Sequence, residues 1–455
     1  MATVGINFGA ASSGTGFDVA ATVTSILAIE SSVETPWKSQ LTQLQAQDTA
    51  LTGLGTNLSS LSTAVSSLTN FDGVLASKQG SSSNNNILAL TSASPTAVAG
   101  SHSVVATSLA TTSSQFSSLI TNASDTLTGS LTLKVGSGAS QTITIGSTNN
   151  TLASLAASIN QGSYGVNASV VTDTQGSRLS LVSSTSGAAG QISLTPNVTD
   201  QTTATAVSFA VGQNGADAQL TVDGLATTSA SNTVTGAIPG VTFQLLQASP
   251  STTLQVQITN DNASVESAVQ TLVGAYNSVV GTLKTQEGKD STGVAQPLYG
   301  SPTLALVQTQ LSSALLGGAG SGSVKSLSQL GVTLNQDGTL TFNQSTLDTT
   351  LNTNFSDVVG YLQNPGSFGQ TFAQAINGLS TGNPEGVLAL ALGQNTTSEA
   401  ALNLSISNTD ARIATDKTNL TTELNTANQI LQSIPSQLTE INQIYSATTG
   451  YNTSH

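Results

Sequence analysis

The stretch TNLTTELNTANQILQSIPSQLTEINQIYSAT, residues 418–448, decides how the rest of this chain is organised. Its apolar residues recur every seven residues in two interleaved rows, Leu420, Ala427, Ile434 and Ile441 in one and Leu424, Leu431, Leu438 and Tyr445 in the other. Ile406 and Ile413 continue the first row upstream. This spacing is typical of the apolar seam of a coiled coil or of a long bundle helix. Pro435 lies inside the tract, so we expect either two helices or one bent helix.

A matching tract lies near the start of the chain. Its apolar residues step by sevens, with three leucines at the alternate positions: Trp37, Leu44, Leu51, Leu58 and Val65, then Leu54, Leu61 and Leu68. One helix with an apolar stripe is marginal in water and needs a partner. We therefore predict that the two tracts pair as a helical leg and that the residues between them form an insertion. The alternative is a pair of surface helices on separate domains.

Composition and charge exclude several functional classes. The 455 residues are enough for two to four domains, but only 7% are charged, against about a quarter in ordinary soluble proteins. The net charge of −14 would repel a phosphate backbone, so nucleic acid is not expected as a partner. The chain has no cysteine, which excludes disulfides and thiolate metal sites. We find no Sec signal peptide and no apolar run long enough to span a membrane.

The order of elements predicts an α+β multidomain fold in which the N- and C-terminal helices pair as a coiled-coil or bundle leg. Antiparallel β domains are inserted between them as a head or plate. A leader covers residues 1–16, and Asp18 is the expected N-cap of the first helix, which breaks before Pro36. Ser264 is expected to cap the helix that follows the β region. A hairpin is expected across Asn335–Gly338.

We expect four parts, each defined by its residue range. Terminal helical segments cover 1–38 and 416–455, a helical leg domain with a small hairpin covers 39–72 and 263–415, a β domain covers 73–124 and 214–262, and a distal inserted β domain covers 125–213. Two hairpins are expected in the distal domain, between residues 131 and 145 and between 166 and 182. Residues 186–215 are weakly patterned.

Motifs for covalent chemistry are missing from the sequence. The only histidines are His102, in an expected strand, and His455, the last residue, so no histidine dyad or zinc site is expected. The candidate carboxylates lie in or beside turn sequences, which explain them better than an active site does: Asp173, Asp217, Asp223 and Asp337. We expect no catalytic residue, no cofactor and no metal.

Short motifs along nearly the whole chain resemble the flagellar filament-capping family, hook-associated protein two. They occur in the family's order: Ser13–Val19, Ile26–Glu30, Pro36, Ala99–Val104, Leu109–Ala110, Ser231–Asn232, Pro239–Phe243, Ala275–Asn277, Pro297–Gly300, Leu330–Thr333 and Asp337–Leu340. His102 departs from the family, which usually has tyrosine there. The family's fold is the one predicted above.

The resemblance implies an extracellular, homo-oligomeric and pentamer-like ring at the tip of the flagellum. It implies export by the flagellar type III route without a cleaved signal peptide, and an export chaperone before secretion. It also implies that the ring helps arriving flagellin to fold and insert. Contacts with neighbouring copies and with the filament would then run along the two seams, through Trp37, Leu44, Leu51, Leu58, Ile413, Leu420, Leu424, Leu431 and Leu438.

Two other functional classes stay open at this point. The chain could be another axial protein, such as flagellin or a hook–filament junction protein, which would form an open helical polymer rather than a finite ring. A secreted β-rich adhesin or a carbohydrate-active enzyme is the alternative from a different class. Glycan binding or hydrolysis by a fragment spanning residues 73–262 would favour it.

Overall fold

The computed structural model describes residues 15–450 and divides the chain into two compact units. One unit is formed by Met1–Thr69 together with Val269–His455, and the other by Asn70–Ala268. The first is built mainly of helices and the second mainly of antiparallel strands, so the predicted fold class is confirmed. The leader predicted for residues 1–16 lies outside the described residues except for Thr15 and Gly16, and so does His455. The four-part division stays a prediction.

Two N-terminal helices form one side of the leg in the first unit. They are α1 (Val19–Ser31) and α2 (Glu34–Thr69). Asp18 caps α1 as predicted, because its carboxylate accepts a hydrogen bond from the N–H of Ala21 at 2.9 Å. The break falls slightly earlier than expected, so that Pro36 lies in the first turn of α2. Its missing N–H has no helical partner there in any case.

Five further helices follow among the described residues of the first unit, which α4 joins at Val269: α4 (Asn262–Gln286), α5 (Pro302–Leu315), α6 (Gln344–Gln363), α7 (Phe368–Leu379) and α8 (Val387–Thr449). The expectation that Ser264 caps α4 is wrong, because Asp261 accepts from the N–H of Ser264 and is therefore the cap. Of the two alternatives expected at Pro435, two helices or one bent helix, the first is wrong, because α8 is continuous through Pro435. Proline removes only its own N–H, and nearby hydroxyls bond to helix carbonyls, as that of Ser433 does to Ile430.

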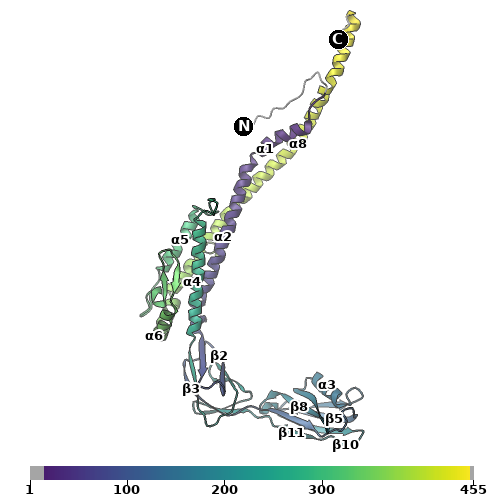
Figure 1. Cartoon of the computed structure of the whole chain (residues 1–455), viewed down its shortest axis with the longest axis vertical. Helices are drawn as coiled ribbons and strands as arrows, with labels where there is room; N and C mark the ends of the chain where they lie inside the picture. The colour runs from purple at the N-terminus through teal and green to yellow at the C-terminus, as the bar shows by residue number, and fades with distance from the viewer. Residues whose placement is uncertain (1–14, 451–455) are drawn as a thin grey trace. The chain divides into compact units, whose positions relative to one another are not determined.

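Helix α8 packs against both α1 and α2, and Figure 1 shows them running beside it. The Asn395 amide donates to the Asp48 carboxylate at 2.7 Å, and the N–H of Phe17 donates to the Asn428 amide oxygen at 2.9 Å. Residues far apart in the sequence thus meet at both ends of this pairing. The predicted pairing of the N- and C-terminal helices is confirmed, since α8 packs against both α1 and α2, whereas the pairing of one seam with the other stays a prediction.

A two-stranded hairpin lies on the helices of the first unit. It consists of β17 (Val332–Leu334) and β18 (Leu340–Phe342), preceded by the short 3₁₀ helix η3 (Leu327–Leu330). The predicted hairpin is confirmed. Gly338 has φ of +81° in its loop, a conformation that side chains with a Cβ rarely adopt.

The second unit contains two separate cores. A five-stranded sheet of order β1-β16-β3-β12-β13 and a three-stranded sheet of order β14-β15-β2 share one. Two four-stranded sheets, β10-β9-β5-β6 and β11-β4-β8-β7, share the other with helix α3. The strands of the first core are β1 (Lys78–Ser82), β2 (Leu88–Ala93), β3 (Gly100–Ser108), β12 (Ala218–Val222), β13 (Leu225–Ser229), β14 (Thr233–Ile238), β15 (Val241–Leu245) and β16 (Leu254–Asn260).

The elements of the second core are β4 (Thr112–Ser117), β5 (Leu127–Val135), β6 (Gln141–Ile145), α3 (Leu152–Gln161), β7 (Val166–Asp173), β8 (Gly176–Ser186), β9 (Ile192–Asp200), β10 (Thr205–Ala206) and β11 (Phe209–Gln213). Both hairpins predicted here are confirmed, as β5 with β6 and β7 with β8. The weakly patterned residues 186–215 contain three strands, which the sequence did not indicate. Polar residues occupy much of β9, so the alternation of a half-buried strand is weak there.

Candidate functional site

The seam on α2 passes from a partly exposed end into the core of the first unit. Trp37 and Leu44 are half-buried, whereas Leu51 and Leu58 are fully buried within the chain. Burying an apolar side chain of this size stabilises the fold by about 1.5–3 kcal/mol, so Leu51 and Leu58 help to hold the unit together. Only the part of the seam around Trp37 and Leu44 leaves apolar surface for another molecule.

The seam on α8 follows the opposite course. Ile413, Leu420, Leu424 and Leu431 are half-buried, whereas Leu438 is exposed. The half-buried residues lie on the part of α8 that runs beside the N-terminal helices, where Val23 and Leu27 of α1 are buried. Beyond Asn428, which meets the start of α1, α8 continues for about 30 Å at 1.5 Å per residue.

This last part of α8 carries an exposed apolar stripe. Five of its large apolar side chains are between 45% and 66% exposed: Ile430, Leu438, Ile441, Ile444 and Tyr445. At about 100° per residue they fall on one face of the helix. Ile430 and Ile444 lie outside the two heptad rows, so the heptad pattern did not indicate them. Their isoleucine side chains, one helical step from the rows, were the signal. An apolar stripe this long on a single helix indicates a partner.

A buried carboxylate lies at the junction of α1 and α2. Glu34 is only 2% exposed, and its Oε2 pairs with the Lys38 ammonium at 2.7 Å, whereas its Oε1 has no hydrogen-bond partner in the part of the chain that the structure describes. The Glu34 carboxylate raises the pKa of Lys38, which also lies near Asp410 of α8. A polar group buried in an apolar helix interface can fix the register of the pairing.

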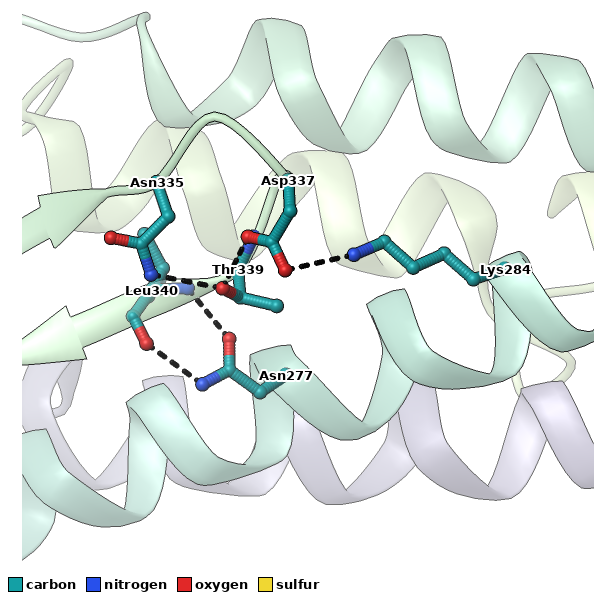
Figure 2. Close-up of polar contacts among 6 residues, drawn as sticks. All are labelled: Asn277, Lys284, Asn335, Asp337, Thr339 and Leu340. Atoms are coloured by element: carbon teal, nitrogen blue, oxygen red, sulfur yellow. Dashed lines mark hydrogen bonds and ion pairs between the residues drawn. The ribbon is translucent and has the colours of Figure 1, made fainter.

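Polar contacts fix the hairpin to α4 at several points (Figure 2). The Asn277 side chain donates to the Leu340 carbonyl at 2.8 Å and accepts from the Leu340 N–H at 2.7 Å, as a neighbouring strand would. At the hairpin tip, Asp337 pairs with Lys284 at 3.1 Å. The Asp337 carboxylate also accepts hydrogen bonds from the hydroxyl and the N–H of Thr339. These two bonds, together with the ion pair to Lys284, lower the pKa of Asp337 to about 2.

The residues considered for chemistry have structural roles. Asp173 accepts from the N–H of Gln175 within its turn, and the Asp217 carboxylate accepts from the N–H of Ala188. His102 lies in β3 and pairs with Asp223 at 2.8 Å. That hydrogen bond is the main reason why the pKa of Asp223 is lowered. Among residues 15–450 no three His, Asp or Glu side chains are grouped so that they could hold a metal ion. Within the same range no helix is long and apolar enough to cross a membrane.

Family models match most of the chain. The model for the C-terminus of flagellar hook-associated protein 2 matches residues 215–448, and the model for its N-terminus matches residues 15–113. Among curated relatives, the B-type flagellar hook-associated protein 2 of Pseudomonas aeruginosa is 32% identical over 319 residues, which cover 64% of this chain and 67% of the relative. The flagellar hook-associated protein 2 of Escherichia coli K12 is 28% identical over 48% of this chain and 50% of its own length.

A solved structure shares the architecture. The crystal structure of the D1-D2-D3 domains of the flagellar cap protein FliD from Escherichia coli has a TM-score of 0.61 and 26% identity to this chain. The match covers 76% of this chain and 99% of that structure. The similarity therefore includes helices as well as strands, and it is not confined to one unit.

Proposed function

The chain belongs to the flagellar hook-associated protein 2 family and is a flagellar filament cap protein, and from that premise we propose how it works. We propose that several copies assemble into a finite, pentamer-like ring at the extracellular tip of the filament. The ring holds exported flagellin subunits, promotes their folding and insertion, and prevents their loss. Flagellin and the hook–filament junction proteins are not favoured, because both family models that match belong to hook-associated protein 2.

One observation carries the proposal, the exposed apolar stripe at the end of α8. Its residues, from Ile430 to Tyr445, have no covering element among the described residues. In the assembled cap the stripe packs against neighbouring copies and against flagellin helices. Charge-poor seams have few ion pairs that would fix one register. Such contacts can therefore slide, as a cap that steps with each new subunit requires.

The action is mechanical rather than catalytic. We infer that the chain needs no cofactor and no metal, and that it works by presenting surfaces to folding subunits. Before export a flagellar chaperone binds the chain, and the type III apparatus then passes it to the filament tip. A chain without cysteine forms no disulfide that would hinder passage through a narrow channel.

Charge placed on the stripe tests the proposal. A double variant, Ile441→Glu with Tyr445→Glu, puts two carboxylates at the contact while leaving the core of the monomer unchanged. Gln443→Glu is the matched control, because it adds charge to the opposite face of the same helical turns. We expect the double variant to abolish rings in electron micrographs and filament growth in a strain lacking its own cap, while Gln443→Glu supports both. Normal growth with the double variant would contradict the proposal.

A further inference from the structure

Helix α1 is the weakly attached element of the leg. Val23 and Leu27 are the two residues of α1 that are buried, and the N–H of Phe17 donates to the Asn428 amide oxygen just before the helix begins. The next helix, α2, has ten buried residues. Because apolar burial is the main force that holds helices together, α2 is fixed in its own chain and α1 is held far less firmly.

A hinge separates these two helices. Ser32 and Val33 lie between them and belong to neither. Pro36 stabilises the break, because a proline inside a continuous helix collides with the carbonyl of the residue four positions earlier, which here is Ser32. The junction therefore does not close into one straight helix. A change in the backbone angles of Ser32 and Val33 turns α1 as a unit.

The surroundings of the hinge are poorly satisfied in a single chain. Ile29 is 49% exposed and Val33 is 46% exposed. Two buried carboxylate oxygens, Glu30 Oε2 and Glu34 Oε1, have no hydrogen-bond partner among residues 15–450. Apolar side chains in water and buried oxygens without partners both cost free energy. A contact that covers or rearranges the hinge is therefore favoured.

Helix α1 of another copy fits the covered stretch of α8 as well as the chain's own α1 does. Every copy has the same Val23 and Leu27 and the same α8. When an identical element is exchanged between copies, its contacts are kept and only the hinge takes a new shape. With 13 residues, α1 is about 20 Å long, whereas packed helices lie about 8–10 Å apart. It therefore spans the distance to a leg packed alongside.

We propose that α1 exchanges between neighbouring copies in the cap, turning at Ser32 and Val33 to pack on α8 of the next copy. Around a closed ring each copy provides one α1 and accepts one, so every α8 keeps its cover. The hinge, with Ile29 and Val33, then lies at the contact between two copies. The exchange rests on the homo-oligomer of the proposed function and names the helix that links its members.

Thiol cross-linking tests the exchange in the full-length chain, which has no native cysteine. A Cβ added at Gly16 would lie 3.0 Å from the Asn428 Cγ, so thiols at these two positions are within reach of each other. In one chain, Gly16→Cys with Asn428→Cys should be joined by a short bis-maleimide in the isolated monomer. Because Gly16 has φ of +65°, which disfavours a side chain, Phe17→Cys is used in parallel.

The two substitutions are then placed in separate populations that carry tags of different size. The populations are mixed and assembled, rings are checked by electron microscopy, and the reagent is added. The matched control is the pair Asp48→Cys and Asn395→Cys, whose native side chains lie 2.7 Å apart where α2 is fixed by its buried residues. We expect the pair at α1 to join the two populations with a yield at least tenfold above that of the control pair.

Two variants identify the face of α1 that makes the contact. Added to the population that carries Gly16→Cys, Val23→Glu should reduce the yield at least tenfold, whereas Thr24→Glu at an exposed position should not. Rings that form normally but give no product above the control pair would overturn the exchange and leave the capping function standing. Equal yields from Val23→Glu and Thr24→Glu would also overturn it. A chain that forms no oligomer would refute both proposals.

Discussion

Replacing Asn277 with alanine should loosen the hairpin while leaving the helices of the first unit in place. The Asn277 amide makes both hydrogen bonds to the backbone of Leu340, a buried residue of β18. Without it, one N–H and one C=O lose their partners, and each unsatisfied buried group costs about 1–3 kcal/mol. Because water can reach a small surface hairpin, we take the lower end for each group, about 2 kcal/mol in total.

Amide hydrogen exchange of the peptide around residues 339–343 measures this loss. Since about 1.4 kcal/mol corresponds to a factor of ten, exchange through local opening should become about 25-fold faster. Lys284→Ala is the control, because the Lys284–Asp337 pair is exposed and screened by solvent and should matter far less. An acceleration below about threefold in Asn277→Ala would refute the argument that the amide acts as a substitute strand. Equal effects from both variants would contradict it as well.

Two further predictions follow from burial and charge. Leu54→Ala should lower the free energy of unfolding of the first unit by about 2–5 kcal/mol, because Leu54 is fully buried. The exposed Leu404→Ala should change it by less than about 0.5 kcal/mol, and the fluorescence of the single tryptophan, Trp37, reports both in urea titrations. The pKa of Asp337 is lowered from 3.8 to about 2, so its contribution to the hairpin is present above about pH 4 and is lost as the pH falls towards 2. The protection of the hairpin amides, taken relative to the intrinsic exchange rate at each pH, should therefore fall across that window in the native chain and not in Asp337→Asn, and equal protection profiles would contradict this assignment.

Local sequence signals were sufficient for most elements of the fold. Heptad spacing predicted α2 and α8, the Asp18 cap predicted the start of α1, and alternation around glycine-rich turns predicted three hairpins. These features depend on residues close to one another in the sequence. The wrong cap for α4 and the unpredicted strand β9 also have causes in the local sequence. Asp261 competes with Ser264 for the same cap, and β9 contains too many polar residues to show alternation.

The candidate assembly surface could be predicted only in part. The heptad rows included Leu51 and Leu58, which the chain buries in its own core, and omitted Ile430 and Ile444, which it leaves exposed. A sequence period shows that a face is apolar but not what covers it. The point at which α1 begins beside α8 decides which turns of α8 have a partner within the chain.

The sequence by itself determined that this chain has two long amphipathic helices enclosing a β region, and that it contains no cysteine. Only the tertiary structure decided which apolar residues remain in water and which side chain binds the backbone of the hairpin. The physical reason is the distance along the sequence over which each interaction acts. Periodicity and capping act between neighbours in the sequence. The exposure of Ile441 and the hydrogen bonds between Asn277 and the Leu340 backbone depend on residues that folding brings together.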